Sequence, residues 1–284
     1  MSLIYVKKRG IMDSKFIASC RQTGIRRVGL NCGLFILAEI MMEIENQLEQ
    51  IAKSYDRHFI EYGKKDALAY DNLPSYITNN PDYPYYKNEQ ESDWEMNRRN
   101  DLIEYLSPAE NMTFIQLGCS LSLMSRGYDK WPSVYHGVDI SKETIQCLNR
   151  FVAEKTLSIG SLYCGSIHET PFDESYFDIG ECIGVLEYYE NEFVLNAIKE
   201  FHRIMKPNGR LVLDIPNSNS PSGRMAMLIE GCMGRPDKFD MSPQEFEDMI
   251  KDYFEIIDSD RIRAESRGES HEGSLYFYNL KCKK

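Results

Sequence analysis

The stretch Phe114–Ser122, FIQLGCSLS, decides the fold class. An apolar run ends at Gly118, small residues follow, and a helical pattern begins near residue 121. Small residues at such a turn let a ligand approach the backbone closely, and the next helix offers unpaired N–H groups in its first turn. The GxGxxG dinucleotide fingerprint fails because Ser120 and Leu123 stand at its second and third glycine positions. The segment indicates an α/β protein whose ligand lacks a pyrophosphate, although many α/β proteins contain a similar turn without a ligand.

A second segment, His136–Ser141, places an acid at the end of the next expected strand. Asp139 lies 21 residues beyond Gly118. In Rossmann-type folds an acid about 20 residues after the glycine turn accepts hydrogen bonds from ribose hydroxyls. We therefore expect Asp139 to bind a ribose. The alternative is that Asp139 only caps the helix that begins at residue 141.

The rest of the chain alternates strand and helix patterns, which predicts a mostly parallel sheet with crossover helices. Expected strands lie near residues 112–117, 133–138, 160–164, 177–183 and 209–215, with helices near 121–128, 141–155 and 192–205. Ser242 and Glu245 form a capping box at the start of the last helix. Strand patterns at 253–258 and 274–282, joined by a polar loop at 265–273, indicate an antiparallel sheet edge.

Three regions are expected along the chain. Residues 1–41 form a basic and apolar N-terminal extension, 42–107 a helical cap with a Tyr/Pro-rich loop, and 108–284 the main domain. The apolar run 28–41 is shorter than the roughly 20 residues of a membrane span. Two interpretations of residues 1–41 stay equally open: they belong to the protein, or translation begins at Met41 or Met42 and the upstream segment is a start-site artefact. We expect residues 1–41 to be dispensable for folding, residues 66–91 to form a covering loop, and residues 92–106 to form a helix.

Composition narrows the class of partner. The 284 residues carry a formal net charge of −11, which opposes binding to a phosphate backbone. The eight cysteines include no CxxC pair and no metal-type cluster with histidine. We expect a cytoplasmic protein with no structural metal, no membrane span and no nucleic-acid partner. Its oligomeric state does not follow from the sequence.

Four further motifs then occur in order. Ser166-Ile167 follows the third strand, Phe177-Asp178 opens the fourth, the run 184–189 (GVLEYY) ends it, and the turn 206–209 (KPNG) leads into the fifth. With the glycine turn and Asp139, this order resembles class I S-adenosylmethionine (SAM)-dependent methyltransferases of the ubiquinone and menaquinone biosynthesis type. The resemblance implies a Rossmann-like fold: a seven-stranded mixed sheet of order 3-2-1-4-5-7-6 with helices on both faces and an N-terminal helical cap.

The resemblance also implies a cofactor, SAM, with S-adenosylhomocysteine (SAH) as product, and a small-molecule acceptor. Glu187 and Tyr188 match the run beside the reacting sulfonium and are the candidate catalytic residues. Glu187 would orient the acceptor or act as a base, and the competing interpretation is a solvated carboxylate at a helix start. The candidate cofactor-binding residues are Gln116, Gly118, Cys119, Ser120, Asp139, Ile140, Ser166, Ile167 and Ile183.

The chain departs from this family at several of these positions. The family usually has an acid where Gln116 stands, glycine at Ser120 and Ser122, and Asp at Ser166. Gln116 offers an uncharged carbonyl oxygen to the ammonium of the methionine moiety. Ser120 can replace the glycine of the turn if its φ is negative. We expect Gln116→Asp to preserve or improve SAM affinity in a working site. The alternative function is a methyltransferase-like binding or regulatory protein without efficient catalysis.

Two segments outside these motifs bear on the acceptor. The tyrosines of 70–86 and the Met-rich stretch 216–241 suggest an aromatic or amphiphilic small molecule. Tyr55, His58 and Tyr62 lie on the expected N-terminal helix, where related enzymes cover the cofactor. Core packing is the alternative for the two tyrosines, and a surface position for His58. His168, beside Ser166, is expected to be exposed.

Overall fold

The computed structural model describes residues 42, 45–56, 73–92, 94–235 and 237–284, and of 94–99 only the backbone. Residues 47–284 form one compact unit, to which the following description applies. The expectations for residues 1–41, His58, Tyr62 and Tyr70 lie outside the described residues. Within those residues, no helix is long and apolar enough to cross a membrane.

Seven strands form one sheet with the order β3-β2-β1-β4-β5-β7-β6. β7 pairs antiparallel with both β5 and β6, and the other pairs are parallel. The expected strand order and its antiparallel edge are therefore confirmed. The strands are β1 (Thr113–Leu117), β2 (Val134–Asp139), β3 (Leu162–Cys164), β4 (Phe177–Cys182), β5 (Met205–Pro216), β6 (Phe254–Ser259) and β7 (Leu275–Cys282).

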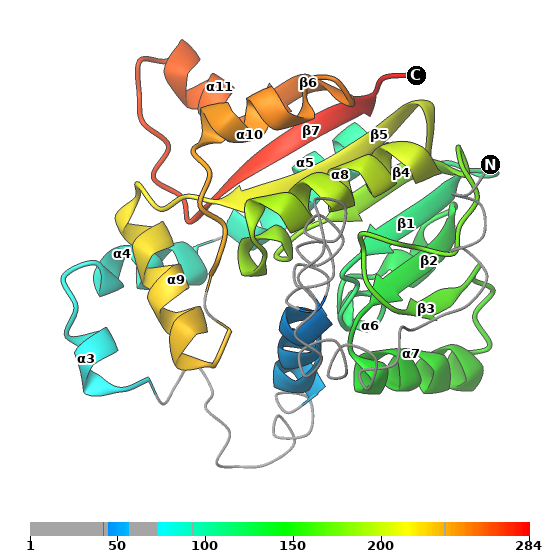
Figure 1. The fold of residues 1–284 in the computed structure, drawn as a ribbon, viewed down its shortest axis with the longest axis horizontal. Helices are drawn as coiled ribbons and strands as arrows, with labels where there is room; N and C mark the ends of the chain where they lie inside the picture. Colours follow the sequence, from blue (N-terminus) through cyan, green and yellow to red (C-terminus); the bar gives the residue numbers. More distant parts are fainter. Residues whose placement is uncertain (1–41, 43–44, 57–72, 93, 236) are drawn as a thin grey trace, which may run out of the picture. The chain divides into compact units, whose positions relative to one another are not determined.

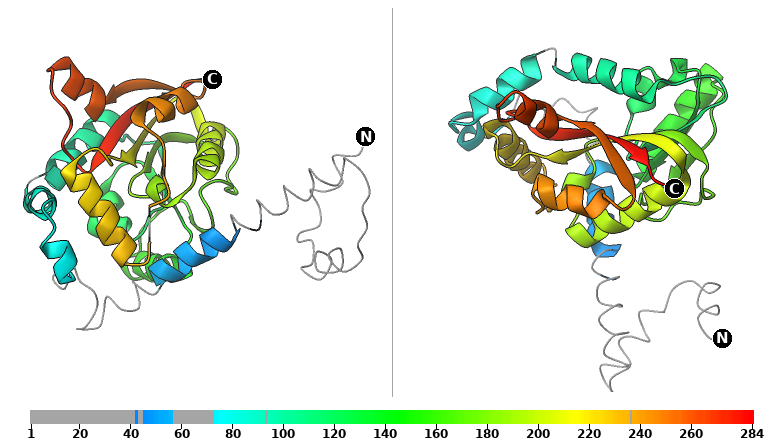
Figure 2. Two further views of the ribbon diagram at one scale, coloured as in Figure 1. Left: turned by 60° about the vertical axis from the view of Figure 1, so that its left-hand side comes forward. Right: turned by 90° about the horizontal axis from the view of Figure 1, so that it is seen from above.

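Helices cover both faces of the sheet, as the right-hand view of Figure 2 shows for α5 on one side and α8 and α10 on the other. α5 and α7 contribute apolar side chains to the same core cluster as β1 and β2. The expected capping box is present at α10, where Ser242 and Glu245 exchange hydrogen bonds. These helices are α5 (Trp94–Leu106), α6 (Ser122–Ser125), α7 (Lys142–Lys155), α8 (Asn191–Ile204) and α10 (Pro243–Ile250), with short 3-10 turns η3 (Tyr128–Lys130) and η4 (Leu186–Tyr188).

The expectation of a covering loop at 66–91 is wrong for its described part. Residues 75–78 form α3 (Ser75–Thr78) and residues 83–91 form α4 (Tyr83–Glu91). Pro74 is the N-cap of α3 and Pro84 lies in the first turn of α4. A proline there loses no hydrogen bond, because the first N–H groups of a helix have no intrahelical partner. The prolines therefore start these helices rather than preventing them.

Two more helices occupy segments that the sequence pattern left irregular. α9 (Pro221–Cys232) follows β5, and α11 (Asp260–Ser266) takes the first residues of the expected loop at 265–273. Each begins at a serine whose hydroxyl accepts a backbone hydrogen bond, Ser220 from Gly223 and Ser259 from Ile262. β5 also begins earlier than expected, at Met205, because a bulge in its pairing with β4 accommodates the KPNG turn.

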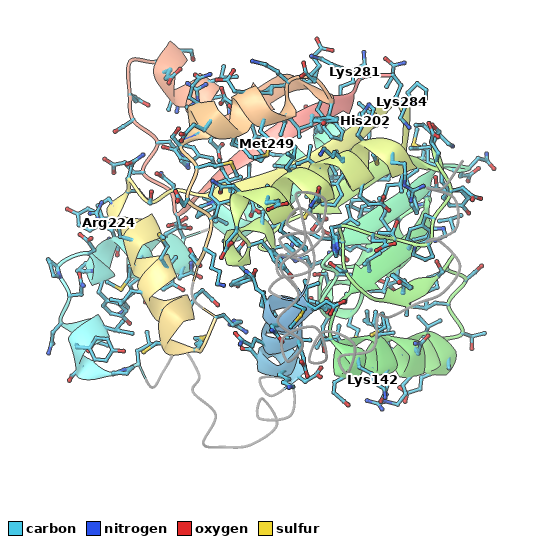
Figure 3. All side chains as sticks on the ribbon, viewed as in Figure 1. Lys142, His202, Arg224, Met249, Lys281 and Lys284 are labelled. Carbon is cyan, nitrogen blue, oxygen red and sulfur yellow. The ribbon has the colours of Figure 1, made fainter. Side chains whose placement is uncertain are left out.

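α3, α4 and α9 form a small layer beside the sheet (Figure 1). Ile77 and Tyr86 pack against Met225 and Ile229 in an apolar cluster of their own. Arg224, labelled in Figure 3, pairs with Asp82 at 2.8 Å. This layer meets the carboxyl end of the sheet, where the cavity described next is located.

Candidate active site

A cavity of about 710 Å³ opens at the carboxyl ends of β1, β2 and β4. It continues beneath α4 and α9 to residues of the helical segment 47–56. Eight of the nine expected cofactor-binding residues line it, as do Glu187 and Tyr188. The eight are Gln116, Gly118, Ser120, Asp139, Ile140, Ser166, Ile167 and Ile183.

Cys119 is the exception among the expected residues. Its side chain is completely buried and belongs to the core cluster between the sheet and α5 and α7. Its backbone N–H donates to the Val138 carbonyl at 2.8 Å. The Cys119 thiol therefore points away from the cavity, and the residue closes the turn through its backbone.

The turn after β1 depends on left-handed backbone conformations. Gly118 has φ +75°, and a Cβ on it would lie 2.3 Å from Val185 Cγ2. Ser120 has φ +43°, so the condition of a negative φ, under which serine would fit this position without strain, is not met. The Ser120 N–H donates to Asp139 Oδ2 at 2.7 Å, which stabilises this conformation. The hydrogen bond to Asp139 thus offsets the conformational cost of a serine at a position where the family usually has glycine.

Asp139 is buried at the end of β2, and its other oxygen accepts the Ser141 N–H at 2.8 Å. Burial raises the pKa of its carboxyl, and the two backbone donors oppose that shift. The N-cap of α7 is Ser141, whose hydroxyl accepts from Thr144, so Asp139 is not the helix cap. Each carboxylate oxygen accepts more than one hydrogen bond, which leaves Asp139 able to bind hydroxyls in the cavity.

At the end of β3, Ser166 hydrogen bonds through Oγ to His168 Nδ1 at 2.6 Å. His168 is half-buried and lies 4.8 Å from the Phe193 ring centre, so the expectation of an exposed His168 is wrong. Ile167 beside it is buried and presents an apolar surface to the cavity. The pair Ser166-Ile167 thus combines a hydroxyl with an apolar wall at this end of the cavity.

Gln116 has partners that its sequence position did not reveal. Tyr135 donates its hydroxyl to Gln116 Oε1 at 2.7 Å, and Gln116 Nε2 donates to Glu181 Oε1 at 3.3 Å. Glu181 stands opposite Gln116 in the β1–β4 register. It also accepts from the Tyr128 hydroxyl and lies 3.5 Å from Arg126 Nη1. An acid is therefore present beside Gln116, on the neighbouring strand.

Glu187 is buried in η4 rather than solvated as a helix-start carboxylate. Its Oε2 has no hydrogen-bond partner among the described residues. Burial raises the pKa of Glu187 well above its ordinary value of 4.5, and Asp214, Asp237 and Glu230 raise it further. A carboxyl with a raised pKa holds a proton more tightly than an ordinary glutamate, which is the property that a general base needs.

Tyr188 forms part of a polar and aromatic wall opposite the turn. Its hydroxyl donates to Glu230 Oε2 at 3.2 Å, and Glu230 also pairs with Arg235 at 2.8 Å. The Arg235 guanidinium stacks 4.8 Å above the Tyr55 ring, and Tyr55 meets Tyr188 edge to face. Tyr55 thus lines the cavity together with these residues.

Sequence reasoning missed Arg126, Glu181, Glu230 and Arg235, all of which line the cavity. Glu181 carried a signal, because it is an acid near the end of the otherwise mostly apolar strand 177–183. A charge in a strand buried on both faces requires a partner or a function. Arg126, Glu230 and Arg235 lie in segments without such a pattern.

Residues 115–213 match the family model described as a methyltransferase domain. The match confirms the resemblance inferred from the motifs at the level of the domain, and the finer likeness to ubiquinone and menaquinone enzymes stays a prediction.

Two curated relatives are similar in sequence. An uncharacterized methyltransferase of Schizosaccharomyces pombe is 27% identical over 168 residues, which cover 58% of this chain and 59% of the relative. An uncharacterized protein of Methanocaldococcus jannaschii is 30% identical over 99 residues, 35% of this chain and 40% of that protein. The chain thus spans about half the length of these relatives.

Among solved structures, a geranyl diphosphate C-methyltransferase of Streptomyces coelicolor A3(2) superimposes with a TM-score of 0.55 and 17% identity. The match covers 84% of this chain and 98% of that chain. That enzyme was crystallised with Mg²⁺, geranyl diphosphate and SAH. At this level of identity the likeness supports the shared fold.

Proposed function

We propose that this protein is a SAM-dependent methyltransferase that acts on a small-molecule acceptor. The observation that carries the proposal is one cavity that joins the turn after β1 to Oε2 of Glu187, which is buried and has no hydrogen-bond partner in the described part of the chain. One part of the cavity offers the groups that a nucleoside needs, and the other offers a proton acceptor beside an aromatic wall. A pocket shared by cofactor and acceptor is what a direct transfer of a methyl group requires.

The residues present fit SAM. The cavity lies within the roughly 300–1,000 Å³ typical of small-molecule sites, and its volume is about 710 Å³. Asp139 would accept hydrogen bonds from the ribose hydroxyls, with Ile140 beside it. Ser166 and Ile167 would contact the adenine, and Gly118 and Ile183 would lie along the middle of the cofactor. Gly118 permits this close approach because it lacks a Cβ.

SAM, when bound, supplies a methyl group attached to a positively charged sulfur. Because that sulfur departs as a neutral thioether, no acid catalyst is needed to protonate the leaving group. The protein's contribution is then to position the acceptor in line with that methyl group and to exclude water. Glu187 would accept a hydrogen bond, or the proton itself, from the attacking atom of the acceptor. Tyr188, with its hydroxyl held by Glu230, would form the wall against which the acceptor packs.

Exchange of the Glu187 carboxylate for an amide tests this function. We expect Glu187→Gln to retain SAH binding and to lower methyl transfer by roughly 100-fold or more, the typical contribution of a general base. The assay supplies SAM with a labelled methyl group and a metabolite extract freed of macromolecules by filtration. Wild-type protein should produce a labelled small molecule, identified by mass spectrometry.

Glu192→Gln is the matched control, because Glu192 is exposed on α8 and should leave turnover unchanged. The wild-type rate should fall as the pH is lowered through the raised pKa of Glu187, above its ordinary 4.5, since protonation removes the acceptor of the proton. Glu187→Gln should lack this pH dependence. A wild type that binds SAH but transfers the label to no molecule, small or large, would refute catalysis and favour a binding protein.

A further inference from the structure

An ion pair between a half-buried arginine and a buried glutamate lies in the cavity wall between β1, β4 and the end of α6. Glu181, near the end of β4, is 1% exposed, and Arg126 follows α6. Both residues line the cavity. Arg126 Nη1 lies 3.5 Å from Glu181 Oε1, so a guanidinium and a carboxylate stand side by side in the cavity wall. Neither residue is needed for the adenosine contacts or for the role of Glu187.

We propose that Glu181 and Arg126 bind the amino-acid end of the cofactor, Glu181 its ammonium and Arg126 its carboxylate. The proposal rests on the proposed function, because it assumes that SAM occupies this cavity. The amino-acid end carries one ammonium and one carboxylate on adjacent positions. A neighbouring carboxylate and guanidinium match both charges and can form a charge-assisted hydrogen bond with each.

The order of residues along the sheet edge supports this placement. Asp139 ends β2, Gly118 follows β1, and Glu181 lies near the end of β4, with β1 between the other two strands. With the ribose at Asp139 and the adenine at the β3 end, the cofactor crosses the Gly118 turn. Its amino-acid end then reaches β4, where Glu181 and Arg126 are located.

The geometry of the pair favours a binding role over a purely structural one. Charge-assisted hydrogen bonds between N–H donors and carboxylates are about 2.7–2.9 Å long, and the Arg126–Glu181 contact is longer, at 3.5 Å. Burying the Glu181 carboxylate, which is 1% exposed, costs several kcal/mol, and a buried charge with a partner gives little net stability compared with apolar packing. A binding role for charges in the wall of a ligand cavity accounts for that cost.

The same geometry explains why residue 116 is an amide. Gln116 Nε2 donates to Glu181 Oε1 at 3.3 Å, and Tyr128 donates to Glu181 Oε2. A carboxylate at position 116 would face Glu181 across paired strands, and two carboxylates so close cannot both ionise easily. The acid that the family resemblance places on the first strand therefore stands one strand away in this chain.

Two ligands separate this role from a structural one. SAH carries the amino-acid end, whereas methylthioadenosine has the same adenosine and thioether without it. We expect Glu181→Gln to weaken SAH binding roughly 10- to 100-fold, as expected when one charge-assisted hydrogen bond is lost, and to change methylthioadenosine binding less than about twofold. Arg126→Gln should show the same selectivity. Isothermal titration calorimetry on the full chain measures both ligands.

The double variant Gln116→Glu with Glu181→Gln moves the acid from β4 to β1, so that the pair of strands again carries one acid. We expect this double variant to recover most of the SAH affinity that Glu181→Gln loses, which a merely structural carboxylate would not explain. Equal weakening of SAH and methylthioadenosine by both single variants, or unchanged SAH binding in Glu181→Gln, would overturn the assignment. Failure of wild type to bind either ligand would instead overturn the proposed function on which the assignment rests.

Discussion

Gln116 on β1 donates a hydrogen bond to the buried Glu181 on the neighbouring strand β4. As an isolated departure from the family pattern it suggests a weakened cofactor site that an acid would repair. The neighbour that changes this interpretation, Glu181, lies 65 residues later in the chain and meets Gln116 only through strand pairing. Side-chain identity was visible in the sequence, but the register between β1 and β4 was not.

The structure therefore reverses the expected effect of Gln116→Asp. A second carboxylate beside the buried Glu181 adds repulsion and removes the donor that Gln116 provides. We expect a lower melting temperature and weaker SAH binding than in wild type, both measured at neutral pH. Gln116→Glu combined with Glu181→Gln is the matched control with an unchanged number of acids. Tighter SAH binding by Gln116→Asp alone would contradict this account of the network.

At the scale of elements, the strands and crossover helices were predictable because their hydrophobic patterns are local. Apolar runs in the sequence predict the buried strands. Two residues, Ser242 and Glu245, are enough to predict the capping box of α10. The helices α3, α4 and α9 were not predicted. The prolines in and around α3 and α4 indicated irregular structure, and the buried faces of all three helices pack mainly on one another rather than on the sheet.

The glycine turn after β1 is an element on which the proposed cofactor site depends. Gly118 combines φ +75° with a position where a Cβ would lie 2.3 Å from Val185 Cγ2. We expect Gly118→Ala to lower the free energy of unfolding by at least about 2 kcal/mol through strain and overpacking, and to weaken SAH binding in the protein that still folds. Urea denaturation and calorimetry measure the two effects.

Gly231→Ala is the matched control for this substitution. Gly231 lies in α9, and a Cβ on it would meet nothing within 4 Å. Alanine should leave stability unchanged or raise it by up to about 1 kcal/mol, because glycine is a poor helix former. Equal stability losses at both positions would show that the turn is not specifically constrained.

At the scale of the whole molecule, the sheet order followed from the sequence because four motifs occurred in the order of one known topology. The residues that line the cavity around Gly118 and Asp139 followed too, since they sit at strand ends that the topology brings together. The wall opposite the turn did not. Tyr55, Glu230 and Arg235 come from distant segments, and only their packing over η4 brings them to one wall.

The central claim is that this cavity holds SAM, and a calorimetric titration of the full chain with SAH tests it most directly. We predict saturable binding of one SAH per chain. Asp139→Ala should weaken that binding at least about tenfold through loss of the ribose acceptor, while Asp129→Ala, on the exposed surface of η3, should not change it. Absence of SAH binding by folded wild type, or equal affinities of wild type and Asp139→Ala, would contradict the claim.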